Sequence, residues 1–249
     1  MDLSVAQWSY AFGVLLLASV VRGLTGFGFS AIIVTGLSLV VAPAQTVMLA
    51  LFLEVVASVR MLPSAWKSVD CKLLTVLCVG TAIGTPLGVR SLLLLSPDII
   101  RLAISCIVLF FAVLIWRGVK YRGTRTVRID GVVGVISGVC NGAAALGGLP
   151  VVTYMLSTET AVVATRATLI AAFFCTDVYT LVVAGGHGII SSQTLINVAY
   201  SVPVLLIGVA VGERLFSVAS PAAFKKIAVL LLMGLSIVGI IKSLMVFFV

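Results

Sequence analysis

An arginine and three glycines interrupt the first long apolar run of the chain, in the stretch Arg22-Gly23-Leu24-Thr25-Gly26-Phe27-Gly28-Phe29. A charged side chain inside a membrane segment is costly, so an intramembrane arginine marks a functional site by default. Its guanidinium carries a permanent charge and a planar fork of donors, which suits the oxygens of sulfite, sulfonate, carboxylate or phosphate. The stretch therefore predicts a site for a small anion.

A second stretch of the same kind lies in the other half of the chain, Asn141-Gly142-Ala143-Ala144-Ala145-Leu146-Gly147-Gly148-Leu149-Pro150. It matches the first at a constant offset of 119 residues, which pairs Gly23 with Gly142 and Gly28 with Gly147. Two glycine-broken apolar segments at corresponding places in two halves are typical of a transporter binding site.

Glycines that open a short helix in mid-membrane expose unpaired N–H groups, and the positive end of the helix dipole there favours an anion. We expect Gly26-Phe27-Gly28 and Gly147-Gly148 to form two such helix starts that face one another. The residues expected to bind the substrate are Arg22, Gly26, Phe27, Gly28, Asn141, Gly147, Gly148 and Arg166.

Each of these features also has a simpler interpretation. Glycines in membrane helices often serve only close packing, which we expect for Gly80, Gly84 and Gly88 because they share one helix face. Arg22 could extend to the membrane surface, and Arg166 could simply pair with Glu159.

Two acidic residues, Glu54 and Asp177, occupy matching places in the two halves at an offset of 123 residues. Buried carboxylates in membrane helices commonly carry protons or cations through a transporter. We expect one of them to couple a proton, and the alternative is that each neutralises a nearby arginine.

The elements that hold these residues follow from composition. With 61% hydrophobic and 10% charged residues in 249, the chain has more apolar surface than a globular core of this size can hide. Apolar runs near the ~20 residues that cross a membrane recur along the whole chain and predict helices. The net charge of +8 is spread over short loops, which argues against nucleic acid, and the five cysteines lie singly, so no metal or cofactor is expected.

A duplication is supported by a second pair of segments. Ile83-Gly84-x3-Gly88-x-Arg90 matches Ile207-Gly208-x3-Gly212-x-Arg214 at an offset of 124 residues. We therefore expect a single transmembrane domain over 1–249, with repeat one at about 1–118, repeat two at about 129–249 and a basic cytoplasmic linker at 117–130.

Each repeat is expected to hold a glycine-broken re-entrant helical hairpin and three transmembrane helices. The second broken segment, at about 131–158, is too short for two crossings of ~20 residues each, so two half-helices fit it better. The first broken segment is expected at about 5–44. The expected spanning helices are 46–62, 73–95 and 99–116 in the first half and 161–183, 194–211 and 224–248 in the second.

The distribution of Lys and Arg sets the orientation. Three crossings per half would invert the second copy and place both termini outside. Eleven cations then lie on the cytoplasmic face, against Arg90, Arg101 and Lys242 on the other, as the positive-inside rule requires. The cytoplasmic cations are Arg60, Lys67, Lys72, Arg117, Lys120, Arg122, Arg125, Arg128, Arg214, Lys225 and Lys226. The fold class is thus an all-α integral membrane protein of two inverted repeats.

The doubled glycine motifs and the paired Gly-x3-Gly-x-Arg segments resemble the TauE/SafE family of sulfite exporters over nearly the full chain. The resemblance implies a multi-pass carrier of the bacterial plasma (inner) membrane that moves sulfite, sulfoacetate or related organosulfonates, often driven by protons. The second copy departs from the first by three alanines, 143–145, and by Asn141 in the place of Arg22.

The function expected is therefore a secondary transporter of a small sulfur-containing anion, working by alternating access with proton coupling. The alternatives are a passive anion channel and a transporter of small carboxylates. No nucleophile or metal motif of an enzyme is present, so no catalytic residue is expected. The expected partners are the anion, protons and the lipid bilayer; the sequence leaves open the particular anion, the direction of transport and a homo-oligomer.

Overall fold

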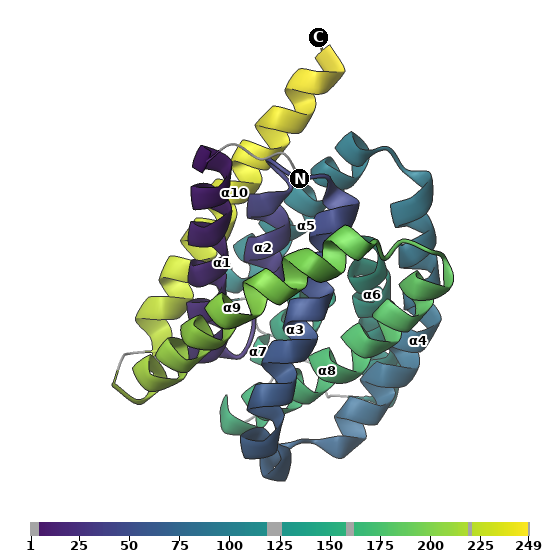
Figure 1. The fold of residues 1–249 in the computed structure, drawn as a ribbon. Helices are drawn as coiled ribbons and strands as arrows, with labels where there is room; N and C mark the ends of the chain where they lie inside the picture. The colour runs from purple at the N-terminus through teal and green to yellow at the C-terminus, as the bar shows by residue number, and fades with distance from the viewer. Residues whose placement is uncertain (1–4, 119–125, 158–161, 219–220, 249) are drawn as a thin grey trace.

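The computed structural model describes residues 5–118, 126–157, 162–218 and 221–248, and these are helical almost throughout, with no strand among them (Figure 1). Much of the expected linker, residues 119–125 with Lys120, Arg122 and Arg125, lies outside the described residues. The helices are α1 (Val5–Thr25), α2 (Phe29–Leu37), α3 (Pro43–Ala65), the 3-10 turn η1 (Trp66–Ser68), α4 (Cys71–Leu94), α5 (Pro97–Arg117), α6 (Val127–Ala144), α7 (Gly148–Ser157), α8 (Val162–Gly186), α9 (Ser192–Val218) and α10 (Pro221–Phe248).

Several helices begin at residues that cap a helix well. The Asp70 carboxylate accepts a hydrogen bond from the N–H of Leu73 at 3.0 Å at the start of α4. Ser96 caps α5, with Pro97 in the first turn, and Thr126 caps α6. These side chains satisfy backbone donors that the first turn leaves free, which explains why the apolar runs start where they do.

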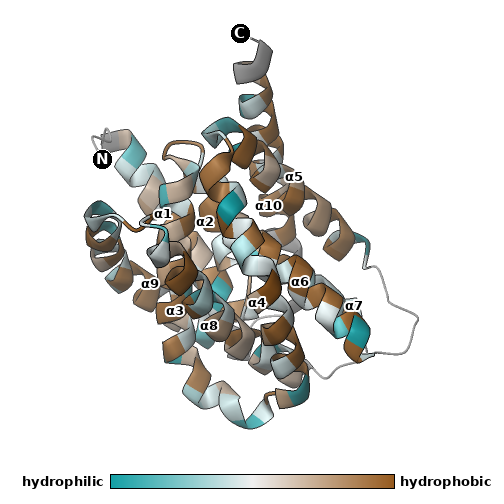
Figure 2. Ribbon diagram, turned by 90° about the vertical axis from the view of Figure 1, so that its right-hand side faces the viewer, coloured by the Kyte–Doolittle hydropathy of each residue, from teal (hydrophilic) through white to brown (hydrophobic). Residues whose placement is uncertain are grey.

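Seven of the described helices are long and apolar enough to cross a membrane, and the chain is a multi-pass membrane protein of the all-helical class, as predicted. The shorter apolar helices are Gly148–Ser157 and Val229–Met245. Hydrophobic residues run along most of each helix, and hydrophilic ones gather toward the ends, as at the turn between α3 and α4 (Figure 2).

Each glycine-broken segment forms one long helix followed by one short helix. In the first half α1 ends at Thr25 and α2 starts at Phe29; in the second half α6 ends at Ala144 and α7 starts at Gly148. The long members, α1 and α6, both qualify as membrane spans by length and apolarity, whereas α2 has nine residues and α7 has ten.

The most extensive helix contacts join the two halves in a regular way. The first helix of each half packs against a spanning helix of the other half: α1 packs against α9, and α6 packs against α4. Helices α3 and α8 pack against each other in the centre, and α5 packs against α10 (Figure 1).

Glycines form the seam between α4 and α6, as the spacing of Gly80, Gly84 and Gly88 predicts. A Cβ atom at these three glycines would lie only 2.6, 2.2 and 2.2 Å from backbone oxygens of α6. Such close approach of two backbones needs residues without side chains.

Candidate functional site

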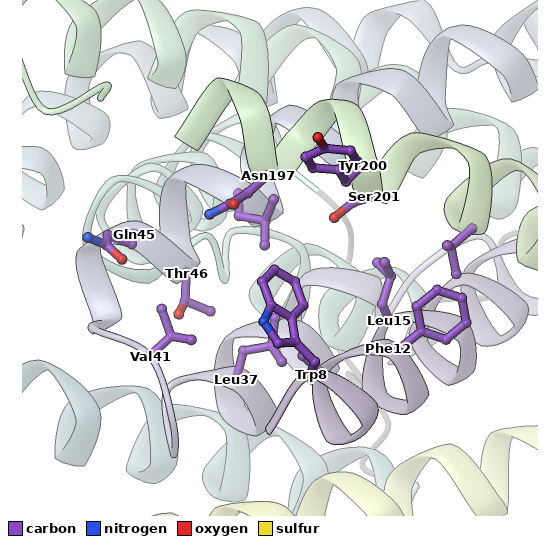
Figure 3. Close-up of a pocket in the computed structure, with 13 residues that line it drawn as sticks. Trp8, Phe12, Leu15, Leu37, Val41, Gln45, Thr46, Asn197, Tyr200 and Ser201 are labelled. Atoms are coloured by element: carbon purple, nitrogen blue, oxygen red, sulfur yellow. The ribbon is translucent and has the colours of Figure 1, made fainter. Parts of the chain in front are cut away.

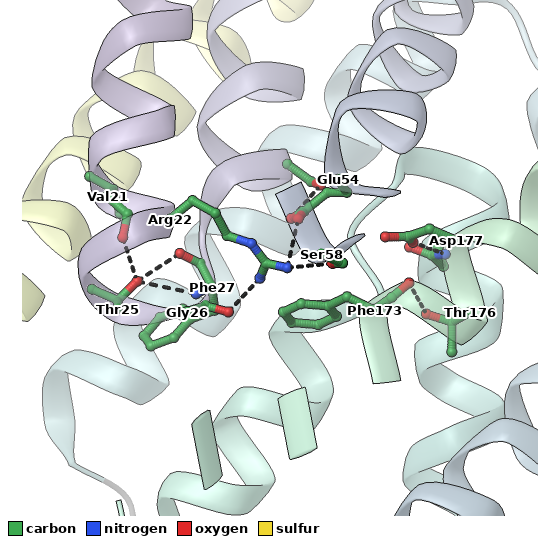
Figure 4. Close-up of polar contacts among 12 residues, drawn as sticks. Val21, Arg22, Thr25, Gly26, Phe27, Glu54, Ser58, Phe173, Thr176 and Asp177 are labelled. Atoms are coloured by element: carbon green, nitrogen blue, oxygen red, sulfur yellow. Dashed lines mark hydrogen bonds and ion pairs between the residues drawn. The ribbon is translucent and has the colours of Figure 1, made fainter. Parts of the chain in front are cut away.

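Arg22 lies in the last turn of α1 and is fully buried, which excludes extension to the surface. Its Nη2 atom lies 3.0 Å from Oε2 of Glu54 and donates to the hydroxyl of Ser58 at 2.9 Å, both on α3. Its Nη1 atom donates to the carbonyl of Gly26. The guanidinium stacks over the ring of Phe173 from α8, 4.7 Å from the ring centroid (Figure 4).

One donor of this guanidinium remains available. The Nε atom of Arg22 is buried and has no hydrogen-bond partner among the described residues. An unsatisfied buried donor is rare and calls for an explanation. A substrate oxygen would supply the missing partner.

The second half repeats the arrangement with uncharged donors. The Asn141 amide nitrogen donates to Oδ1 of Asp177 at 2.8 Å and to the hydroxyl of Thr180 at 3.0 Å. Asn141 and Asp177 are both buried, like Arg22 and Glu54. In each half, a donor from the long helix before the break thus contacts a carboxylate and a hydroxyl on the long helix after the break, α3 or α8.

The two short helices begin at one small cavity between these groups. It is lined by Gly28 and Ser30 at the start of α2, Gly148 and Leu149 at the start of α7, and the two carboxylates among others. Its volume is about 20 Å³. That is room for about one water molecule, so a larger ligand requires the walls to separate.

The structure therefore brings most of the expected site residues together. Phe27, Gly28, Glu54, Asn141, Gly148 and Asp177 all line this cavity. Three further expected residues are linked to those that line the cavity. Arg22 pairs with Glu54, and the carbonyl of Gly26 accepts from Arg22. The N–H of Gly147 donates to Oδ1 of Asn141 at 3.2 Å.

Several of the glycines make room for protein side chains. A Cβ at Gly26 would lie 2.7 Å from Cγ of Arg166, and one at Gly148 would lie 2.7 Å from the Phe173 ring. At Gly147 it would lie 2.7 Å from Cβ of Asn141. These glycines let the site residues approach the chain breaks closely.

Arg166 lies beside the first break and not on the cavity wall. Its Nη2 atom donates to the carbonyl of Gly23 at 2.9 Å. The other partner considered from the sequence, Glu159, lies outside the described residues.

Four polar or aromatic residues of the site were not predicted from the sequence: Ser30, Ser58, Phe173 and Thr180. Helical spacing could have indicated three of them. Ser58 lies one turn after Glu54, Thr180 lies three residues after Asp177, and Phe173 lies four residues before it. Residues three or four apart share a helix face.

No metal site is evident: within the described ranges, no group of three or more His, Cys, Asp or Glu side chains gathers. A second, larger cavity of about 310 Å³ lies among α1, α2, α3 and α9 (Figure 3). Apolar side chains such as Phe12, Leu15 and Val204 line most of it, and Gln45, Asn197 and Ser201 add polar groups.

The comparisons with known proteins give one match. The family model described as "Sulfite exporter TauE/SafE" matches residues 11–239. No curated protein and no solved structure matches the chain.

Proposed function

The chain belongs to the TauE/SafE family of sulfite exporters, and from this premise we propose that it is a secondary transporter of a small sulfur-containing anion. The substrate is sulfite, sulfoacetate or a related organosulfonate, and the membrane is the bacterial plasma membrane. The observation that carries the proposal is Arg22: a fully buried cation with one free donor, beside the point where two helices begin.

The chemistry of the site favours an oxyanion. The N–H groups at the starts of α2 and α7 present the positive ends of two helix dipoles to the same cavity. The guanidinium adds a permanent charge and directional donors. A sulfite or sulfonate group, with three oxygens around one sulfur, can accept from several of these donors at once.

The two repeats are inverted in this proposal, and each broken segment is a helical hairpin with a re-entrant short arm. Helix pairing supports the inversion, because α1 with α9 and α6 with α4 are equivalent contacts under a twofold exchange of the halves. The ends of the bundle support it too: α1 begins and α10 ends at one end, and the turn between α3 and α4, with Lys67 and Lys72, lies at the other (Figures 1 and 2).

A difference between the equivalent seams supports alternating access. Phe12, Leu15 and Val204 line the larger cavity between α1 and α9. By the repeat offsets their counterparts are Gly131, Gly134 and Gly80, which lie in direct backbone contact between α6 and α4. The two seams thus differ at this end, while Gly23 and Gly212 keep the rest of the α1–α9 seam in close backbone contact. In the proposed mechanism, transport exchanges the open and closed ends of the two seams around the central site.

Flux into proteoliposomes tests the proposal. Sulfite uptake should saturate and show counterflow, because a carrier binds its substrate before moving it. Flux that rises linearly with concentration would instead indicate a channel, and preference for acetate over sulfite would indicate a carboxylate carrier.

Arg22→Gln should abolish this flux, with Arg60→Gln as the matched control, because Arg60 is exposed, pairs with Glu213 and does not line the cavity. Removing Arg22 leaves Glu54 without its counter-ion, so the double variant Arg22→Gln with Glu54→Gln removes one charge of each sign and keeps the net charge of the site unchanged. Sulfite transport by the folded double variant at the wild-type rate would disprove the role of Arg22.

A further inference from the structure

The carboxylate of Glu54 occupies the place on Arg22 where a substrate anion would bind. Oε2 of Glu54 lies 3.0 Å from Nη2 of Arg22, and Oε1 accepts from the hydroxyl of Ser30 at 3.0 Å. Ser30 belongs to the first turn of α2. A guanidinium, a hydroxyl and a helix start are the donors that an oxyanion would use, and here an internal carboxylate already uses two of them.

The charges at this site limit what can bind. Arg22 is a single cation, while Glu54 and Asp177 are two carboxylates on the same small cavity. An anion added to ionised Glu54 and Asp177 would place three negative groups against one guanidinium in a buried site. Uncompensated buried charge is expensive, so anion binding favours the uptake of a compensating positive charge, which protonation of a carboxylate would supply.

The two carboxylates differ in their partners. Asp177 accepts a hydrogen bond from the Asn141 amide. This amide is uncharged, so an anion has no cation to take from Asp177. Glu54 pairs directly with Arg22.

Other charged groups on the helices around α3 are engaged elsewhere. Arg166 of α8 donates to Gly23, Glu213 of α9 pairs with Arg60, and Arg101 of α5 pairs with Asp98. From α2 and α6 the residues facing the cavity are uncharged, with Ser30 and Asn141 as the polar ones.

We infer that Glu54 is the exchangeable counter-ion of Arg22: the substrate anion replaces the carboxylate on the guanidinium, and Glu54 takes up one proton as it leaves. Asp177 acts as a positioning residue that orients Asn141. This inference rests on the proposed function, and it explains how one anion and one proton occupy the site together. As long as Glu54 is ionised, its carboxylate occupies the guanidinium of Arg22 and keeps anions away from it. Protonation of Glu54 frees the guanidinium for the substrate.

Calorimetric titration of the purified protein with sulfite, over a series of pH values, tests the exchange. At pH values where Glu54 is ionised, each rise of one pH unit should lower the sulfite affinity of the wild type. The factor by which it falls should be about tenfold larger than in Glu54→Gln, because one proton is linked to binding in the wild type. The titration of sulfite itself is common to all variants and cancels in this comparison. Asp177→Asn should keep the wild-type slope.

A second measurement covers the case in which Glu54→Gln does not fold. Wild-type protein is titrated with methanesulfonate, whose charge is fixed, in two buffers of different ionisation heat. The difference in binding heat between the buffers gives the number of protons taken up, which should be about one per anion bound. No proton uptake, or equal pH slopes in wild type and Glu54→Gln, would overturn the inference while leaving the anion site intact. No binding of either anion at any pH would overturn the proposed function as well.

Discussion

Gly26 and Ala145 are equivalent residues of the two halves, and both adopt the left-handed conformation, with φ angles of 80° and 55°. Ala145 is the one described residue other than glycine with a positive φ. The strain lies on the wall of the central cavity, since Ala145 lines it. Strained backbone tends to gather at functional sites, where surrounding structure enforces it.

Exchanging the two residue types should therefore have opposite effects on stability. Gly26→Ala should destabilise the protein, by about 1–2 kcal/mol for the left-handed backbone and more for overlap with the Arg166 side chain. Ala145→Gly should leave stability unchanged or raise it by up to about 1 kcal/mol. Thermal unfolding in detergent measures both, and a loss of stability in Ala145→Gly would contradict this account of the strain.

Helix starts and apolar lengths were predictable from the sequence because they depend on neighbouring residues. The expected helix at 73–95 is α4 at Cys71–Leu94, and the expected helix at 99–116 is α5 at Pro97–Arg117. Which helices pack against each other depends on whether their surfaces fit. The sequence indicated such a contact face only where glycines repeat, as at Gly80, Gly84 and Gly88.

At the scale of the helices, the glycine seam between α4 and α6 should be sensitive to a single methyl group. A Cβ at Gly88 would lie 2.2 Å from the carbonyl oxygen of Val139, so Gly88→Ala must push the helices apart, at a cost of about 1–3 kcal/mol.

Gly13→Ala is the matched control within a helix, because a Cβ at Gly13 has no neighbour within 4 Å. The control should unfold at the wild-type temperature or above it, since alanine favours a helix more than glycine does. Equal midpoints for both variants would contradict the close packing of this seam.

For the whole molecule, the proposed inversion of the two repeats predicts where the chain is accessible. A tag inserted after Arg125 should be reachable only from the cytoplasm, and a tag after Val249 only from the outside. Labelling with a membrane-impermeant reagent, before and after the membrane is opened, distinguishes the two sides. Reaction of both tags from the same side would rule out the inversion.

The sequence predicted most of the residues that meet around the central cavity, but not the contacts that join them. The repeat offsets placed Arg22 opposite Asn141 and Glu54 opposite Asp177. The ion pair of Arg22 with Glu54 and the contact of Asn141 with Asp177 depend on how α1, α3, α6 and α8 meet, which no local pattern specifies. The simpler interpretation, that a carboxylate neutralises an arginine, describes the resting contact of Glu54.

The most direct test of the central claim is a thermal-unfolding scan of purified protein in detergent with sulfite, sulfoacetate, sulfate and acetate. A ligand that binds only the folded state raises the midpoint. We expect a rise with sulfite or a sulfonate in the wild type and in Arg60→Gln, and none in the folded double variant Arg22→Gln with Glu54→Gln. An equal rise in that double variant, or no rise with any sulfur oxyanion, would contradict an anion site at Arg22.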